Sequence, residues 1–381
     1  MKMNKLFTLL VVSVLITSCN RDKENTYTIP ETYQFSDKMG NNTVSFSGQT
    51  TRFNQLSEIT TYMKTANTPG VSLSETQLLE MYSNNSGLGS TYFSVMAGAA
   101  GKQLREKTAR NEPLIIGRFD ERFKNIATIS ATTQTGVYGA QLGSPGVLQS
   151  GTSAYLVNDK GAEYTQLIEK GLMGAVFYDQ IQNVYLGADK MNLDNSTSVD
   201  ATGGLYYTAM EHSWDEAFGY FTEVIDYPTS GTDRFWGKYS NLVDPILQTN
   251  SKIMLAFRTG RAAISNKDYS TRDNQINIIR GELERVAAGA AIHYLNQSII
   301  QFTDDALRSH YMSETAGFIE TLYFTNTSTA IISGTSLDNM LLKLKDNTGA
   351  YNFYEITLQE IVALRDDIAT AMGWSDIKLD L

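Results

Sequence analysis

Several long stretches of this chain repeat apolar residues at helical spacing on more than one side. In the stretch 162–186, apolar and small residues fill one helical face, and Leu172, Val176 and Leu186 fall on another. A helix without a free polar face must be covered on both sides, so this pattern predicts the buried member of a helical bundle. Similar or shorter helical patterns are expected at 205–221, 243–264, 272–301, 305–324 and 357–371. We therefore predict an all-α fold, a helical bundle.

Three glycines on the apolar faces strengthen this prediction. Gly171, Gly174 and Gly219 lie inside expected helices, where glycine costs about 1 kcal/mol relative to alanine. A glycine kept at that cost predicts a place where a neighbouring helix approaches closely.

Outside the helices, two regions have other patterns. Residues 20–50 contain short alternating runs that predict extended segments or a small hairpin, and residues 131–161 are rich in Gly, Ser and Thr and predict a long loop. The expected organisation is a signal peptide at 1–18, a tether and extended segment at 19–50, and a bundle domain at 51–381. The similarity of 170–187 and 211–221 to 285–302 and 313–324 suggests two related halves, or two ordinary amphipathic helix pairs.

The N-terminus has the pattern of an export signal. Lys2 and Lys5 precede an apolar run from Leu6 to Ile16, which is too short to span a bilayer as a helix. The residues Ile16 to Cys19 resemble a bacterial lipobox, in which the cysteine is acylated and becomes the first residue of the mature chain. Cys19 is the sole cysteine, and we expect it to anchor the protein in a membrane. The alternative is a plain signal peptide whose cleavage site happens to contain a cysteine.

Composition excludes other classes. One cysteine cannot build a disulfide scaffold or a thiolate metal cluster. A net charge of −10 argues against a nucleic-acid partner, because a phosphate backbone needs a basic surface. The chain also lacks the zincin, nucleophile-elbow and P-loop motifs. The sequence therefore favours a non-enzymatic protein.

Several segments resemble one known family. TYTIPETYQF, VSFSGQTTRF, GAEYTQLIEKGLMGAVFYDQI, EHSWDEAFGYF, AFRTGRAAI and AAGAAIHYLNQ look like segments of Bacteroidota lipoproteins that share domain of unknown function 4856, and the resemblance covers nearly the whole mature chain. It implies an outer-membrane lipoprotein. The charged residues 20–24 after Cys19 resemble the surface-export signal of such lipoproteins, although a solvated linker would have the same composition.

A more distant resemblance is to imelysin-like helical-bundle proteins, which are linked to iron uptake. Their motif Gly-x-His-x-x-Glu corresponds here to Met210 through Asp215, with Met in place of Gly and Asp in place of Glu. The resemblance implies a metal or metal-chelate function, with a divalent metal or iron as the candidate cofactor, and an outer-membrane uptake receptor as partner. The two substitutions weaken that implication.

The candidate site centres on His212. Asp215 and Glu216 follow it by three and four residues and share its helix face. This arrangement suits a metal ligand set, an acid–base pair or a structural hydrogen-bond network. Glu163 and Asp179, on the preceding long helix, are further candidate oxygen ligands. His310 and Glu314 have the same spacing on a helix rich in polar residues, which predicts a solvated pair.

These patterns predict a membrane-tethered binding protein that assists nutrient or iron uptake. The alternatives are a metal-dependent, peptidase-like hydrolase and a purely structural surface protein. The missing catalytic motifs favour binding.

Overall fold

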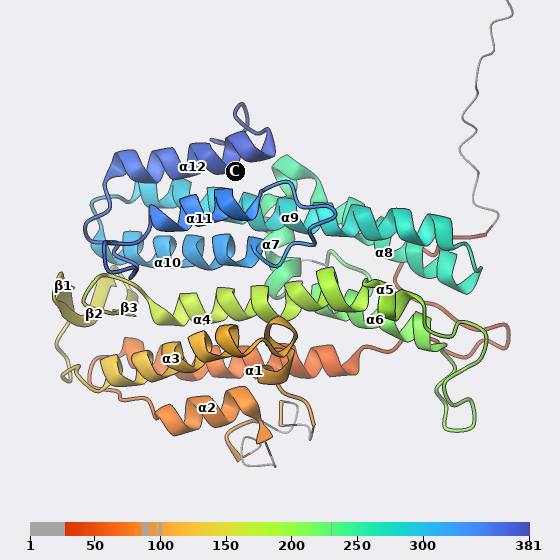
Figure 1. The fold of residues 1–381 in the computed structure, drawn as a ribbon. Coiled ribbons are helices and arrows are strands. Elements are labelled where there is room, and N and C mark those ends of the chain that lie inside the picture. Colours follow the sequence, from red (N-terminus) through yellow and green to blue (C-terminus); the bar gives the residue numbers. More distant parts are fainter. Residues whose placement is uncertain (1–26, 86–90, 95–96, 99–100, 230) are drawn as a thin grey trace, which may run out of the picture.

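The computed structural model describes residues 27–85, 91–94, 97–98, 101–229 and 231–381. The predicted signal peptide and Cys19 lie outside the described residues. The described part is mostly helical, which confirms the helical class, but it also contains a three-stranded sheet, so the all-α prediction needs that correction (Figure 1). Among the described residues, no helix combines the length and the apolar character needed to cross a membrane.

The first half of the chain forms the lower and central layers of Figure 1. Its elements are α1 (Ser47–Lys64), η1 (Thr65–Asn67), α2 (Glu75–Ser83), η4 (Arg105–Asn111), α3 (Pro113–Ser130), β1 (Gly139–Gln141), β2 (Ser144–Ser150), β3 (Ser153–Val157), α4 (Tyr164–Leu172), η5 (Met173–Tyr178), η6 (Gln180–Tyr185) and α5 (Ala188–Met191). The second half forms α6 (Ala209–Phe221), α7 (Phe235–Leu247), α8 (Thr249–Ser265), α9 (Tyr269–Ile300), α10 (Asp305–Leu322), α11 (Gly334–Leu342) and α12 (Leu358–Met372).

The helix predicted at 162–186 is the centre of the fold. It begins as α4 and continues with π-helical geometry through η5 and η6, and nearly all of it is buried. It packs against α1 and α3 on one side and against α10 on the other (Figure 1). A π-helical turn frees carbonyl groups from their usual partners, and the indole Nε1 of Trp236 donates to the Met173 carbonyl at 3.0 Å. The buried, two-sided helix predicted from its pattern is confirmed.

The close approach predicted at the glycines is also confirmed. A Cβ atom on Gly174 would lie 2.2 Å from Thr321 Oγ1 and 2.9 Å from Thr321 Cα, both on α10. A Cβ on Gly219 would lie 2.6 Å from the Cβ of Phe46, just before α1, and 3.0 Å from the Cβ of Gln49 on α1. These distances leave no room for a side chain, so the neighbouring segments can pack this closely only with glycine at these positions.

Helix starts follow local signals. Ser74 caps α2 by accepting a hydrogen bond from the Gln77 amide. Thr208 and Glu211 form a reciprocal capping box at the start of α6. Such caps satisfy amides that the first helical turn leaves without partners.

The loop prediction for 131–161 is wrong over most of its length. Residues 139–157 form an antiparallel sheet in the order β1-β2-β3. Gly143 and Gly151 adopt positive φ in the two tight turns, a geometry typical of hairpins. Each strand has few inward apolar residues, and Val147 and Leu148 are the buried pair of β2. The alternation of apolar and polar residues in these strands is therefore too short to be recognised in a segment rich in Gly and Ser.

The N-terminal segment is extended, as predicted. Residues 27–46 contain no helix and one isolated bridge, between Ser36 and Asn42. The bundle begins slightly earlier than expected, since α1 starts at Ser47. The two related halves stay a prediction.

Candidate ligand-binding pocket

His212 lies on α6 with its ring partly exposed. Its Nδ1 donates to the Ser45 carbonyl at 3.1 Å, and its Nε2 lies 3.9 Å from Glu216 Oε2. The ring of Tyr207 stacks on it at 4.6 Å between centroids. A backbone carbonyl that fixes Nδ1 leaves Nε2 as a free electron-pair donor, so this pair offers two metal-ligand atoms.

Asp215 points away from His212 into a sealed network. Its Oδ1 accepts from the Tyr33 hydroxyl at 2.8 Å and from Arg261 Nε at 2.9 Å, and its Oδ2 accepts from the Ser45 amide at 3.1 Å. Arg261 also pairs with Glu211 at 2.6 Å. The side chains of Asp215 and Arg261 are completely buried. The i,i+3 spacing therefore did not bring Asp215 to the imidazole, because Arg261 on α8 orients the carboxylate.

The two carboxylates from the preceding helix have other partners. Glu163 accepts from His310 Nδ1 at 2.6 Å. Asp179 pairs with Arg110 and accepts from Asn183 at 2.9 Å, and burial raises its pKa to about 6 although Arg110 opposes the shift. Within the described ranges, no three His, Cys, Asp or Glu side chains gather as a metal site would require. The five predicted residues therefore do not form one ligand set.

His310 and Glu314 are not the solvated pair that the sequence predicts. Glu314 is buried, and the His310 side chain is 17% exposed, with its ring stacked on Tyr155 at 4.4 Å. Burial alone would lower the pKa of His310, but the charge and hydrogen bond of Glu163, together with the charge of Glu314, raise it above its ordinary value. The polar residues of α10 that suggested solvent exposure instead face the start of α4. Ser313 is an example, because its hydroxyl accepts a hydrogen bond from the backbone amide of Glu163.

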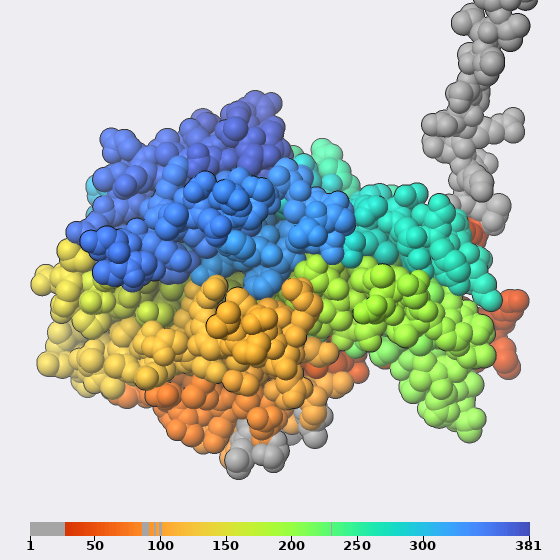
Figure 2. All heavy atoms as spheres, in the orientation of Figure 1, coloured from red at the N-terminus to blue at the C-terminus, as the bar shows by residue number. Residues whose placement is uncertain are grey.

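A pocket of about 550 Å³ opens on another face, between α3, α10, α11 and the turn after α11. Figure 2 shows this face, with α3 in orange and yellow below the blue segments. Its lining combines six charged residues, three tyrosines, two asparagines and several apolar residues: Ile115, Arg118, Glu121, Arg122, Asn125, Asn158, Ala162, Tyr164, Leu167, Glu320, Tyr323, Phe324, Asp338, Leu341, Lys345, Gly349, Ala350 and Tyr351. Ligand pockets commonly measure about 300 to 1,000 Å³, so this one suits a small molecule.

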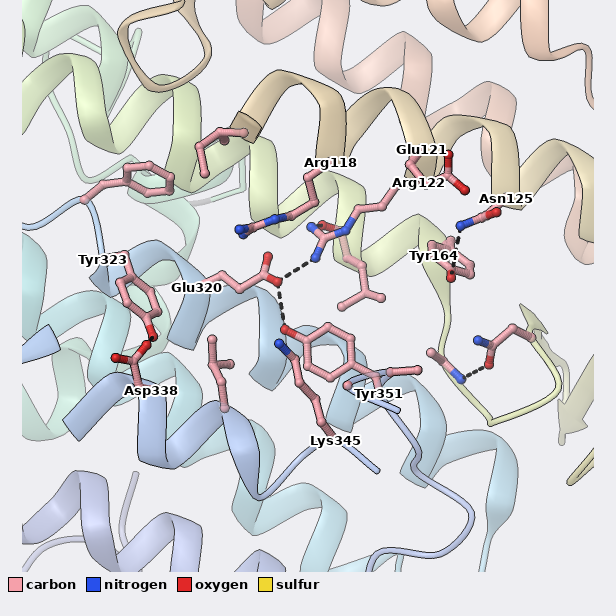
Figure 3. Close-up of a pocket in the computed structure, with 18 residues that line it drawn as sticks. Arg118, Glu121, Arg122, Asn125, Tyr164, Glu320, Tyr323, Asp338, Lys345 and Tyr351 are labelled. Atoms are coloured by element: carbon pink, nitrogen blue, oxygen red, sulfur yellow. Dashed lines mark hydrogen bonds and ion pairs between the residues drawn. The ribbon is translucent and has the colours of Figure 1, made fainter. Parts of the chain in front are cut away.

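The centre of the pocket is a shared carboxylate. Glu320 Oε1 accepts from Arg122 at 2.5 Å and from the Tyr351 hydroxyl at 2.7 Å (Figure 3). Burial alone would raise the pKa of Glu320, but the charge and hydrogen bond of Arg122 outweigh it and lower the pKa below its ordinary value. Arg122 also donates to the Leu167 carbonyl at 2.9 Å. These bonds fix the floor of the pocket before any ligand enters.

Two further cations face the same centre. In Figure 3, Arg118 and Lys345 point from opposite sides toward Glu320 and Tyr351. The Lys345 ammonium lies 5.3 Å from the centre of the Tyr351 ring. Neither Arg118 nor Lys345 makes a side-chain hydrogen bond or ion pair with the described residues. The centre therefore holds three cations and one carboxylate.

The two ends of the pocket have a different chemistry. At one end, Asn125 donates to the Tyr164 hydroxyl at 3.4 Å, and Glu121 lies beside it in Figure 3. At the other end, the Tyr323 hydroxyl donates to Asp338 at 2.5 Å. The ends thus offer amide, phenol and carboxylate groups, which bind hydroxyl groups well.

A family model described as Domain of unknown function (DUF4856) matches residues 30–375. The chain belongs to the DUF4856 family. The match includes both the pocket and the His212 pair. Neither the search of curated proteins nor the search of solved structures returned a match.

Sequence reasoning missed the pocket of this DUF4856 chain. Its charged residues lie in α3, at the end of α10, on α11 and in the following turn, up to about 230 positions apart in the chain. One weak signal was available, since Arg118 and Arg122 have i,i+4 spacing on α3. Two like charges at that spacing disfavour a helix unless a partner or ligand neutralises them.

Proposed function

We propose that this chain is an outer-membrane lipoprotein, exposed at the cell surface, that binds a small organic ligand in the Glu320 pocket and assists nutrient uptake. The observation that carries the proposal is the pocket itself, whose size suits a small molecule and whose Arg118 and Lys345 make no side-chain hydrogen bond or ion pair with the described residues. A charged group that is left unpaired in a concave site favours a ligand of opposite charge.

The membrane part of the proposal rests on Cys19. The lipobox resemblance and the likeness to Bacteroidota lipoproteins support an acylated anchor and an outer-membrane partner, with an uptake receptor as the protein that would receive the ligand. Cys19→Ala should release the protein from membranes or leave it uncleaved. A variant that fractionates with the outer membrane like the parent protein would contradict the anchor.

Any metal that this protein carries would be bound as part of a chelate and not as a bare ion. The described residues provide His212 and Glu216 as a pair, whereas a tightly bound metal needs three or four ligands. A metal chelate would instead enter the Glu320 pocket through the carboxylates of its organic part. The distant resemblance of the sequence to imelysin-like proteins favours an uptake function and adds no residue to the pocket.

The test is a thermal-shift and native mass spectrometry screen of the full-length chain against a panel of sugars, organic acids, peptides and metal chelates. Ala350→Trp places an indole in the pocket and should abolish the shift produced by any true ligand. Ala330→Trp, in an exposed turn that does not line the pocket, is the matched control. A ligand that still binds Ala350→Trp at full affinity would show that the pocket is not its site.

A further inference from the structure

We infer that the pocket takes a sugar acid, with the ligand carboxylate held between Arg118 and Lys345 and its hydroxyl groups held at the Asn125 end. This inference rests on the proposed function and names the ligand class for the same pocket. The observation behind it is that one cavity of about 550 Å³ has cationic groups at its centre and amide, phenol and carboxylate groups at its ends.

The first step is the charge at the centre. Glu320 already neutralises Arg122 through a 2.5 Å ion pair. Arg118 and Lys345 face the same place from α3 and from the turn after α11 (Figure 3). The remaining charge at the centre is therefore positive. A guanidinium and an ammonium on opposite sides suit a carboxylate, because each donates charged hydrogen bonds to one of its two oxygens.

The second step is the position of the acidic residues. Asp338 accepts from the Tyr323 hydroxyl at one edge of the pocket. Glu121 is exposed and lies beside Asn125, on the far side of the view from Asp338 (Figure 3). A purely anionic ligand that filled the whole cavity would meet both carboxylates. A ligand with one acidic group at its centre and hydroxyl groups elsewhere avoids that repulsion and gives each carboxylate a donor.

The third step is the neutral part of the lining. The side-chain Oδ1 of Asn158 accepts from the backbone amides of Lys160 and Ala162 at 3.0 and 2.8 Å, so the side chain is fixed while its NH2 group remains a donor. Asn125 presents a carbonyl oxygen, since its amide group donates to Tyr164. Paired donors and acceptors of this kind, next to the faces of Tyr164 and Tyr351, are the groups that recognise a hydroxylated ring.

The decisive experiment compares sugars that differ only in the acidic group. Isothermal titration calorimetry on the full-length chain would use D-galacturonate against D-galactose and D-glucuronate against D-glucose. We expect at least one uronate to bind, at least about tenfold more tightly than its neutral counterpart, and more weakly as salt increases, because charged hydrogen bonds supply the difference.

Two variants locate the acidic group. Arg118→Gln and Lys345→Gln should each weaken uronate binding about tenfold or more and reduce the difference in affinity between a uronate and its neutral counterpart. Lys124→Gln, an exposed lysine on the same helix as Arg118 that does not line the pocket, should have no effect.

Three outcomes would overturn the inference: equal affinity for uronate and neutral sugar, uronate binding that survives both variants, or no uronate binding at all. If the broader screen still finds a ligand that Ala350→Trp blocks, the proposed function stands while the sugar-acid class fails. If no compound of the screen depends on the pocket, the proposed function fails as well.

Discussion

The arginine–carboxylate networks around Arg261 and around Glu320 differ in charge balance and exposure. In the Arg261 network, one guanidinium faces the two carboxylates Asp215 and Glu211, and its side chain is completely buried. In the Glu320 network, one carboxylate faces Arg122 and two further cations, beside an open cavity. The first network has each of its groups satisfied by the protein itself, while the second keeps cationic groups that the protein does not satisfy.

The Arg261 network stabilises the fold, whereas the cations of the Glu320 network are available to a ligand. Every nitrogen of the Arg261 guanidinium donates to a protein oxygen, including the Thr43 carbonyl in the extended N-terminal segment. The network therefore fastens that segment to α6 and α8. Arg118 and Lys345 make no side-chain hydrogen bond or ion pair with the described residues, so their charges remain available to a ligand.

The largest expected effect is in the sealed network. Arg261→Ala leaves two buried carboxylates without their cation and should lower the free energy of unfolding by about 3 to 5 kcal/mol. Chemical denaturation monitored by circular dichroism measures this. Lys252→Ala on the same helix is the control, because its ion pair is 3.9 Å long and the side chain is 42% exposed, so its effect should stay below about 1 kcal/mol. If Arg261→Ala and Lys252→Ala are equally stable, the Arg261 network does not stabilise the fold more than an exposed ion pair does.

A smaller loss is expected in the pocket. Arg122→Ala should cost about 1 to 3 kcal/mol, since Glu320 loses its partner but water in the cavity can hydrate the carboxylate that remains. The same denaturation experiment applies. If Arg122→Ala lowers the free energy of unfolding as much as Arg261→Ala does, water does not hydrate the Glu320 carboxylate in the pocket.

The pocket carboxylate should also make the protein sensitive to acid. The pKa of Glu320 is lowered in the fold, so its contribution is complete above its ordinary pKa and is lost as the pH falls through the lowered value. Between about pH 5 and pH 3, the wild-type protein should lose more stability than Glu320→Gln, which has no carboxylate to protonate at this position. Glu121→Gln, at an exposed position without an ion pair, should follow the wild-type curve. If Glu320→Gln loses as much stability as the wild-type protein, the ion pair with Arg122 contributes nothing.

The smallest effect is expected for Arg118 and Lys345. Arg118→Gln and Lys345→Gln should change the free energy of unfolding by no more than about 1 kcal/mol, because neither side chain has a hydrogen bond or ion pair to lose among the described residues and the contact of Lys345 with the Tyr351 ring is a weak one. Thermal unfolding in the absence of ligand measures this. A loss of several degrees in the melting temperature would show that these residues serve the fold.

Some of the fold could be predicted because its signals are local. The two-sided apolar pattern of 162–186 identified the central helix, and Gly174 identified its close contact with a neighbour. The Ser74 cap is likewise a local feature, because a cap needs only residues within one turn. The sheet at 139–157 was missed because strands of three to seven residues carry few alternating positions.

The candidate site was harder to predict because contacts between helices decide it. His212 and Glu216 lie together, as their i,i+4 spacing suggests. Asp215 shares the same turn of α6 yet faces Arg261, and Glu163, expected near His212, pairs with His310. A spacing within one helix fixes which face a side chain occupies, but not which neighbour it meets there.

The sequence by itself therefore determined the helical class, the central helix and the close-packing glycines, because periodicity is a property of the chain. The membership of a family came from the match of its segments to that family. Only the tertiary structure decided that Arg118, Glu320 and Lys345 meet at one cavity. These residues belong to segments whose relative register depends on side-chain packing across several layers. Their meeting is a consequence of the fold, and no local pattern in the chain records it.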